Sequence, residues 1–425
     1  MKPLAYEGRS LSLDGADLAS IAAKTGTPCY VYSAAAILEN YRAYDVGLGD
    51  APHSVCYAVK AAGNLSILRL LAQAGAGFDI VSGGELFRVL KAGGDAAKVV
   101  FSGVGKTAEE VDAALDAGIF AFNCESAPEL ALIDALAHRR RMKARVALRV
   151  NPDVDALTHA YISTGRRAHK FGVDIAEAEA VYECAREHRN LLVEGVSCHI
   201  GSQLLDLAPV MEAVDRVMEL IERLRSQGFE IRHVDFGGGL GVAYKPEDVA
   251  PDIGAFAAAL CERTAGKGLH VTVEPGRSIV AGAGVLLTRV LYRKSAQRKR
   301  CARKEEQTAG KEFVIVDAAM NDLIRPALYS AYHEIVPLRE SGPPTLRADV
   351  VGPVCETGDF LARDRDLPEV FPGDLLAVCT AGAYGFVQAS NYNSRPRPAE
   401  ALIENGSWRV IRERETFDDL IRGER

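Results

Sequence analysis

Short apolar segments alternate with longer amphipathic segments between about residue 54 and residue 280. The apolar segments are rich in Val, Ile and Phe, as buried parallel strands are, and they read SVCYAVKA, GFDIVSGGE, KVVFSG, IFAFNCES, RVALRVNP, VEGVSCHIGSQ, HVDFGGGLG and VTVEPGR. The segments between them have helical spacing, and several, such as GELFRVLKAGG and AEEVDAALDAG, end in glycine, which favours a helix C-terminus. Eight such units over roughly 250 residues predict a (β/α)8 barrel of the TIM type. An open, doubly wound sheet is the competing interpretation.

The pattern changes outside this region. From about Phe313 the chain has short strand-like segments separated by turns (FVIVDA, ADVVGPVC, DLLAVCTAGAY, SWRVIRE), which predict an antiparallel β-sandwich or β-barrel domain. The segment TPCYVYS near the N-terminus reads as one more strand of that domain. We therefore expect a barrel domain over residues 36–285 and a β domain made of residues 1–35 and 286–425. The segment from Lys294 to Gly310 is patternless, and we expect the basic stretch within 293–311 to be a flexible, solvated insertion.

Composition narrows the possible partners and the compartment. The chain has 425 residues, of which 48% are hydrophobic, and a formal net charge of −7, which argues against nucleic acid as a partner. We see neither an apolar run of about 18 residues nor a signal-peptide pattern, so no membrane partner is expected. Nine cysteines without a CxxC pair favour reduced thiols in the cytoplasm over a disulfide framework or a zinc site.

Polar residues stand at the ends of most of the strand-like segments. In a (β/α)8 barrel these C-terminal strand ends form the active-site face. Any one of these residues could simply be a loop end, but their convergence on one face predicts a functional site. They are Lys60, Asp79, Ser82, Glu85, Asn123, Asn151, His199, Ser202, Gly237 to Gly241, and Glu274 with Pro275, Gly276 and Arg277.

A glycine cluster, Gly237 to Gly241, follows the seventh strand-like segment. Glycines allow backbone N–H groups to close around an anion, and barrels often bind phosphate after strands seven and eight. The dinucleotide pattern GxGxxG does not fit, because Val242 stands where its last glycine is needed. We therefore expect a single phosphate group, to which Ser202 and the N–H of Gly276 can also donate.

Three further residues point to a flat cofactor with an aldehyde. His199 occurs without an HxH or HExxH pattern, so we expect its ring to stack on a cofactor and not to bind a metal. A carboxylate buried at Glu274 needs a cationic partner, and a protonated ring nitrogen is one. Lys60, in a partly desolvated pocket, can act as a nucleophilic amine. A phosphate pocket together with these groups predicts a site for pyridoxal 5′-phosphate, with Lys60 as its Schiff-base residue and Asp79, Gly237, Gly238 and Gly239 among the residues around it.

The motifs also resemble a known family. The order YAVKA, FDIVSGGEL, HIGSQ, DFGGGLG, EPGR, CETGD and AGAYG resembles the barrel-type pyridoxal phosphate-dependent decarboxylases of basic amino acids, whose fold is that of alanine racemase. Within that family, HAYISTGRRAHKFGV at residues 159–173 and MNDLIRPALYSAYHEI at residues 320–335 resemble the diaminopimelate decarboxylase branch. The resemblance implies decarboxylation of meso-2,6-diaminopimelate to L-lysine, the last step of bacterial lysine biosynthesis. Related decarboxylases of ornithine, arginine or carboxynorspermidine, an alanine-racemase-like enzyme and an inactive, partner-binding relative are the alternatives.

Individual roles also come from the resemblance. Ser202, Gly239, Gly276 and Tyr384 would hold the phosphate, His199 would stack on the ring, and Glu274 would pair with its nitrogen. Cys355, in CETGD, would return a proton to Cα. The family is dimeric, and its active sites are shared because the neighbouring chain supplies the Cys-Glu segment.

The far end of the substrate can be argued from chemistry. It carries a carboxylate, which a planar guanidinium binds with two parallel hydrogen bonds, so Arg277 and Arg325 are candidates. We also expect Arg277 to be one of the cofactor-binding residues. Tyr329 can add a hydroxyl, Glu356 can bind the far ammonium, and Tyr384 is a further contact.

Overall fold

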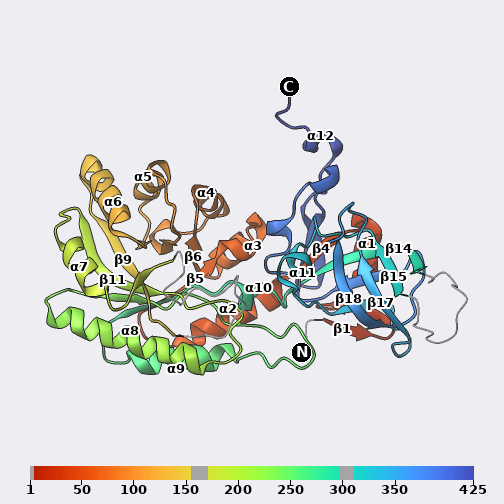
Figure 1. The fold of residues 1–425 in the computed structure, drawn as a ribbon, viewed down its shortest axis with the longest axis horizontal. Coiled ribbons are helices and arrows are strands. Elements are labelled where there is room, and N and C mark those ends of the chain that lie inside the picture. Colours follow the sequence, from red (N-terminus) through yellow and green to blue (C-terminus); the bar gives the residue numbers. More distant parts are fainter. Residues whose placement is uncertain (1–3, 155–170, 297–310) are drawn as a thin grey trace, which may run out of the picture. The chain divides into compact units, whose positions relative to one another are not determined.

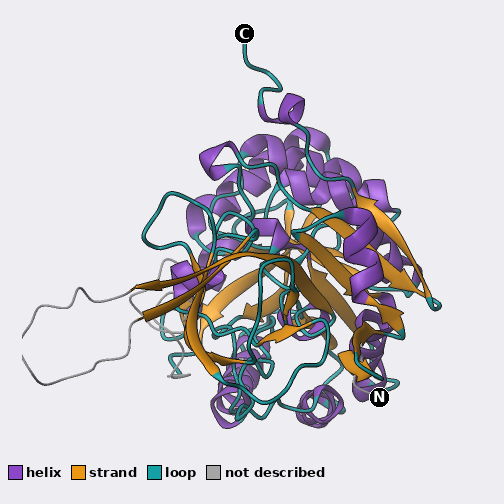
Figure 2. Cartoon of the chain, turned by 90° about the vertical axis from the view of Figure 1, so that its right-hand side faces the viewer, coloured by secondary structure: helices purple, strands orange, loops and turns teal. Residues whose placement is uncertain are grey.

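The structure, a computed structural model, describes residues 4–154, 171–296 and 311–425. These residues form two compact units (Figure 1). Figure 2 shows their helices, strands and loops in separate colours. One unit, here called the barrel unit, consists of Leu38–Ala243 and Asp248–Ile279. The other, here called the β unit, consists of Met1–Ile37, Tyr244–Glu247 and Val280–Arg425.

A closed ring of parallel strands forms the centre of the barrel unit. The strands are β5 (His53–Ala58), β6 (Gly77–Ile80), β7 (Val99–Phe101), β8 (Ala121–Cys124), β9 (Ala144–Asn151), β11 (Leu191–Cys198), β12 (His233–Asp235) and β13 (His270–Val273). Neighbours follow the order β9–β11–β12–β13–β5–β6–β7–β8, and β8 pairs with β9 to close the ring. A two-residue strand, β10 (Val173–Asp174), pairs with β9 outside the ring. The predicted barrel is therefore confirmed, and the open sheet is excluded.

Helices connect the strands and surround the ring (Figure 1). They are α2 (Ala34–Leu48), α3 (Leu65–Gln73), α4 (Gly83–Ala92), α5 (Ala108–Ala117), α6 (Ala127–Arg140), α7 (Ala178–Arg186), α8 (Ala208–Ser226), α9 (Ile253–Thr264) and α10 (Arg277–Val280), with 3₁₀ turns η1 (Val59–Ala61) and η2 (Ala96–Lys98). Side-chain caps from Ser82 and Thr107 start α4 and α5. Gly93 and Gly118 end these helices with φ values of 86° and 69°, as the sequence predicts.

The β unit is built on a second large sheet. The strands of this sheet are β4 (Cys29–Ser33), β14 (Gly284–Ala296), β15 (Lys311–Val316), β16 (Ile335–Pro337), β17 (Leu346–Val351), β18 (Phe360–Leu367), β19 (Leu375–Val378), β20 (Ala399–Glu404) and β21 (Ser407–Arg412). A separate small sheet contains β1 (Leu4–Glu7), β2 (Ser10–Leu13) and β3 (Ala16–Asp17). Helices α1 (Leu18–Thr25), α11 (Arg325–Tyr329) and α12 (Phe417–Leu420) and turns η3 (Phe386–Gln388) and η4 (Tyr392–Ser394) complete the unit. Strand β4 lies between β14 and β20, so the N-terminal strand joins this unit as predicted.

Two features of the β unit differ from the prediction. The pairs β15–β17 and β4–β20 are parallel, so the large sheet is mixed and not wholly antiparallel. We expected the insertion to begin at Lys294, but strand β14 continues to Ala296. Lys294 itself is paired with Phe313 of β15. Backbone hydrogen bonds to β15 hold these residues whatever their side-chain pattern. The remainder of the insertion, residues 297–310, lies outside the described residues.

The N-terminal segment is part of the core of the β unit. Leu13, Leu18, Ile21, Val31 and Leu287 are all fully buried in one hydrophobic cluster.

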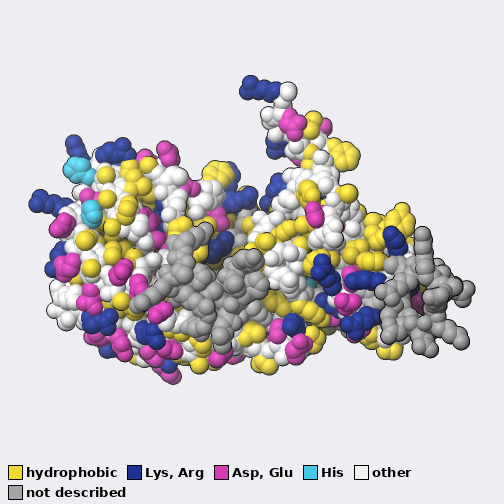
Figure 3. Space-filling view, viewed as in Figure 1, with side chains coloured by type: hydrophobic (Ala, Val, Ile, Leu, Met, Phe, Trp, Pro, Cys, Tyr) yellow, Lys and Arg dark blue, Asp and Glu magenta, His cyan; other side chains and the backbone are white. Residues whose placement is uncertain are grey.

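In the described part of the chain, no helix combines the length and the apolar character needed to cross a membrane. Charged side chains of both signs are spread over the face of the barrel unit shown in Figure 3.

Candidate active site

Lys60 lies in the 3₁₀ turn that follows β5, at the C-terminal end of the barrel strands. Its ammonium forms an ion pair with the carboxylate of Asp79, which is fully buried in β6. The register of the two strands explains the contact, because Ala58 at the end of β5 pairs with Asp79. The Lys60 side chain remains 36% exposed, so its amine is both held and accessible.

A buried polar network lies around Glu274, directly after β13. Ser102 Oγ donates to Glu274 Oε1 at 3.0 Å, and Asn123 Nδ2 lies 3.1 Å from the same oxygen. Asn123 Nδ2 also donates to Asp235 Oδ2 at 2.9 Å, and Asp235 Oδ1 accepts the Gly237 N–H at 2.8 Å. Four barrel strands or their ends therefore contribute side chains to one cluster.

Carboxylates outnumber cations around Glu274. Burial raises the pKa of Glu274 well above its ordinary range, and the carboxylates of Asp235 and Asp79 add to the rise. Burial also raises the pKa of Asp235. Lys60 is the cation that acts against the rise at Glu274. A cationic ring nitrogen beside Glu274 would relieve this repulsion and favour the ionised carboxylate.

His199 follows β11 and has a defined protonation state. The Gly238 N–H donates to His199 Nδ1 at 3.1 Å, so Nδ1 is an acceptor and the ring proton is on Nε2. Burial lowers the pKa of His199 well below its ordinary value, and the charges of Arg149 and Lys60 lower it further. The ring is therefore a flat, neutral surface.

The glycine cluster after β12 is packed so closely that side chains are excluded. A Cβ on Gly238 would lie 2.3 Å from the Glu274 carbonyl oxygen, and one on Gly239 would lie 2.4 Å from the Gly201 carbonyl oxygen. Gly239 also has a φ of +112°, which L-residues rarely adopt. Among the described residues, the N–H groups of Gly239 and Gly276 have no hydrogen-bond partner. Arg277 Nη2 donates to Ser202 Oγ at 2.9 Å, which brings these two predicted residues together.

Sequence reasoning missed three members of the site: Arg149, Ser102 and Asp235. Arg149 is 7% exposed, and its Nη1 donates to Glu125 Oε1 at 3.0 Å. Its Nε and Nη2 atoms are buried and have no partner within the described ranges. The signal was present, because an arginine near the end of an apolar barrel strand is poor strand filler.

These residues fit pyridoxal phosphate. The glycine N–H groups and the unpaired donors of Arg149 suit anionic oxygens, and the site of Glu274 suits a protonated ring nitrogen. The neutral ring of His199 suits stacking. In the described part of the chain, no group of His, Cys, Asp and Glu side chains could hold a metal ion.

The β unit contains the other predicted residues. Arg325, the first residue of α11, is 6% exposed, and Tyr329, its last residue, is partly exposed. Cys355 and Glu356 are exposed in the turn between β17 and β18, where the Cys355 N–H donates to Asn393 Oδ1 at 2.8 Å. Tyr384, with a φ of 55°, is partly buried in the loop after β19.

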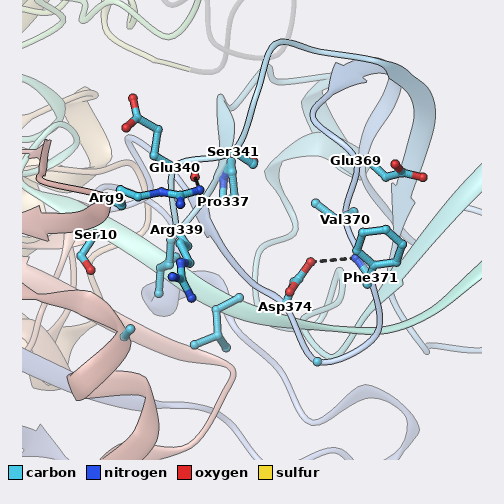
Figure 4. A pocket seen from close by; sticks show the side chains of 14 residues that line it. Arg9, Ser10, Pro337, Arg339, Glu340, Ser341, Glu369, Val370, Phe371 and Asp374 are labelled. Atoms are coloured by element: carbon cyan, nitrogen blue, oxygen red, sulfur yellow. Dashed lines mark hydrogen bonds between the residues drawn. The ribbon is translucent and has the colours of Figure 1, made fainter.

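A cavity of about 580 Å³ also opens in the β unit (Figure 4). Arg9 and Arg339 lie on one side of it, and Phe371 and Asp374 lie on the other. All four of these side chains are exposed, and none of the predicted site residues lines the cavity. This cavity lacks the buried polar groups that lie around Glu274 at the C-terminal end of the barrel strands.

Comparison with known proteins identifies similar chains. Residues 34–281 match the family model described as the pyridoxal binding domain of pyridoxal-dependent decarboxylases. The chain is 53% identical over 424 residues to the diaminopimelate decarboxylase of Pseudomonas aeruginosa, covering 100% of this chain and 99% of that one. Its structure is similar to that of the Helicobacter pylori diaminopimelate decarboxylase complexed with L-lysine (TM-score 0.89, 42% identity, 96% and 98% coverage). It is also similar to the M. jannaschii enzyme in complex with L-lysine (TM-score 0.91, 38% identity, 99% and 97% coverage).

Proposed function

We propose that this chain, which belongs to the pyridoxal-dependent decarboxylases and within them to the diaminopimelate decarboxylases, converts meso-2,6-diaminopimelate to L-lysine and carbon dioxide. The observation that carries the proposal is the 53% identity over the full length of a diaminopimelate decarboxylase. The cofactor of the family is pyridoxal phosphate, which, when bound, takes up the electron pair left by carbon dioxide. The reaction is the last step of bacterial lysine biosynthesis.

The chain's own residues would prepare the barrel mouth for this chemistry. The Lys60 amine would hold the cofactor's aldehyde carbon, and Asp79 keeps that amine in place. Glu274, steered by Ser102 and Asn123, would keep the ring nitrogen protonated. His199 would lie against the ring, and Ser202, Gly237 to Gly239, Gly276 and Tyr384 would surround the phosphate.

The remaining candidates would act on the substrate. Arg277 and Arg325 would bind the distal carboxylate, which supplies selectivity because a guanidinium pairs with a carboxylate through two hydrogen bonds. Tyr329 and Tyr384 would add hydroxyl contacts, and Glu356 would bind the distal ammonium. The Cys355 thiol would return a proton to the carbon that has lost carbon dioxide.

The proposal extends to assembly and location. We propose a homodimer with shared active sites, which the exposed positions of Cys355 and Glu356 support. Mixing Lys60→Ala and Cys355→Ala chains should then restore part of the activity that each lacks alone.

Residues 36–285 would form the cofactor domain, with 1–35 and 286–425 completing the site. The eight described cysteines are free thiols, which supports a reducing cytoplasm.

A substrate panel tests the proposed activity. Purified protein with pyridoxal phosphate is given meso-2,6-diaminopimelate, L-ornithine, L-arginine or carboxynorspermidine, and carbon dioxide release is measured. The proposal expects release from meso-2,6-diaminopimelate far above the others. Faster release from one of the three competitors would assign the chain to that substrate instead.

A further inference from the structure

The guanidinium of Arg325 is oriented by a buried histidine, His333, which lies in the motif at residues 320–335 but for which the sequence predicts no role. Arg325 Nη1 lies 2.9 Å from His333 Nε2, eight residues further along the chain. His333 is 0% exposed and Arg325 is 6% exposed, so this contact is removed from water. It joins the first residue of α11 to the segment that leads into β16.

The direction of this hydrogen bond follows from the other ring nitrogen. His333 Nδ1 lies 2.9 Å from the Cys379 carbonyl oxygen, which can only accept. Nδ1 therefore carries the proton, and Nε2 presents its lone pair to the Arg325 N–H. The backbone of His333 is fixed as well, because Arg365 Nη1 donates to its carbonyl oxygen at 2.8 Å. The acceptor is thus a neutral imidazole held in one tautomer.

A second contact fixes the plane of the guanidinium. Its Cζ lies 4.5 Å from the centroid of the Tyr244 ring, a cation–π distance. The Tyr244 ring meets the His333 ring edge to face, with centroids 5.3 Å apart. Tyr244 is itself buried. One neighbour therefore fixes the plane of the guanidinium, and the other fixes its rotation within that plane.

From this geometry we infer that His333 is a positioning residue that aims Arg325 at the distal carboxylate of the substrate. The inference rests on the proposed function, because it takes Arg325 as the carboxylate-binding residue. A bidentate pair requires the guanidinium plane to meet the carboxylate in register, so an arginine that is free to rotate binds less tightly and selects less well. His333 itself does not touch the reacting atoms.

Two matched variants test the hydrogen bonds of the two His333 ring nitrogens one at a time. His333→Asn retains a donor near the Nδ1 position for the Cys379 carbonyl but lacks an acceptor for Arg325. His333→Gln places an amide oxygen near the Nε2 position and retains the acceptor for Arg325. We expect His333→Asn to raise the KM for meso-2,6-diaminopimelate at least about tenfold, the factor lost with one hydrogen bond from a charged donor, and to change kcat little. We expect His333→Gln to stay within about threefold of wild type in KM.

A ligand pair distinguishes positioning from a loss of structure. L-Lysine and 1,5-diaminopentane differ by one carboxylate, and their Kd values with the holoenzyme can be measured by calorimetry. His333→Asn should weaken lysine binding and leave 1,5-diaminopentane unchanged. If both ligands weaken equally, or if the Asn and Gln variants behave alike, the positioning role is wrong.

A third variant separates this inference from the proposed function. Arg325→Gln should weaken lysine binding at least as much as His333→Asn does. Weak binding in Arg325→Gln together with normal binding in His333→Asn overturns only the role of His333. Normal lysine binding in Arg325→Gln removes the distal-carboxylate role of Arg325, and the inference with it.

Discussion

Acid should destabilise the barrel through one buried histidine, His233, and replacing it should remove that sensitivity. His233 begins β12 and is 4% exposed. Its ring meets the Phe120 ring at 5.4 Å, while a Cβ on Gly195 would lie 2.0 Å from its Nε2. Burial, together with the charges of Arg145 and His270, lowers the pKa of His233 from 6.5 to about 3. The folded protein therefore holds this ring neutral.

The size of the effect follows from proton linkage. Between pH 6.5 and pH 3 the unfolded chain binds a proton at this residue and the folded chain does not, so stability falls as the pH falls through that window. At pH 5 the unfolded imidazole is about 97% protonated, and integrating from neutral pH to pH 5 gives a loss of about 2 kcal/mol. The consequence reaches the site, because β12 carries Asp235 and leads into Gly237.

Urea unfolding at pH 7.5 and pH 5 measures this loss. We compare wild type with His233→Leu, an apolar side chain of similar volume, and with His138→Gln at an exposed histidine. Other groups titrate in the same range, so the informative quantity is the difference between variants. His233→Leu should lose about 2 kcal/mol less than wild type on acidification, and His138→Gln should match wild type. An equal loss in His233→Leu and wild type would refute the reasoning.

The remaining predictions concern the site. Gly238→Ala should abolish tight pyridoxal phosphate binding, because its Cβ would lie 2.3 Å from the Glu274 carbonyl oxygen; normal affinity in an absorbance titration would contradict this close packing. Arg277→Ala should raise the KM for meso-2,6-diaminopimelate at least about tenfold through the lost carboxylate pair, and an unchanged KM in steady-state kinetics would remove Arg277 from substrate binding. Cys355→Ala should lower kcat at least about a hundredfold and leave cofactor affinity unchanged, so a near-normal kcat would exclude its thiol as the proton donor.

Much of the barrel is predictable from sequence because its strands are local and periodic. Each strand is a short apolar run, and most of these runs end in polar residues that packing alone does not require. Lys60, His199 and Glu274 could be identified because they interrupt apolar patterns at an end where a barrel concentrates its chemistry. The family motifs then attached roles to these positions.

Contacts between distant segments could not be predicted in the same way. Asn123 joins Asp235, the last residue of β12, and Glu274, which follows β13, and only closure of the ring brings these side chains together. The parallel pairing of β15 with β17 also depends on tertiary packing. His333 lies in the family motif at residues 320–335, but its role follows only from its contacts, above all from the tautomer that the Cys379 carbonyl imposes.

The central claim is that this protein decarboxylates meso-2,6-diaminopimelate with the help of the Lys60 amine. The most direct test incubates purified protein with pyridoxal phosphate and this substrate, and measures carbon dioxide and L-lysine together, with Lys60→Ala as the control. We predict equal amounts of the two products from wild type and almost none from the control. Product formation by Lys60→Ala at the wild-type rate, or no product from a wild-type protein that binds the cofactor, would contradict the account.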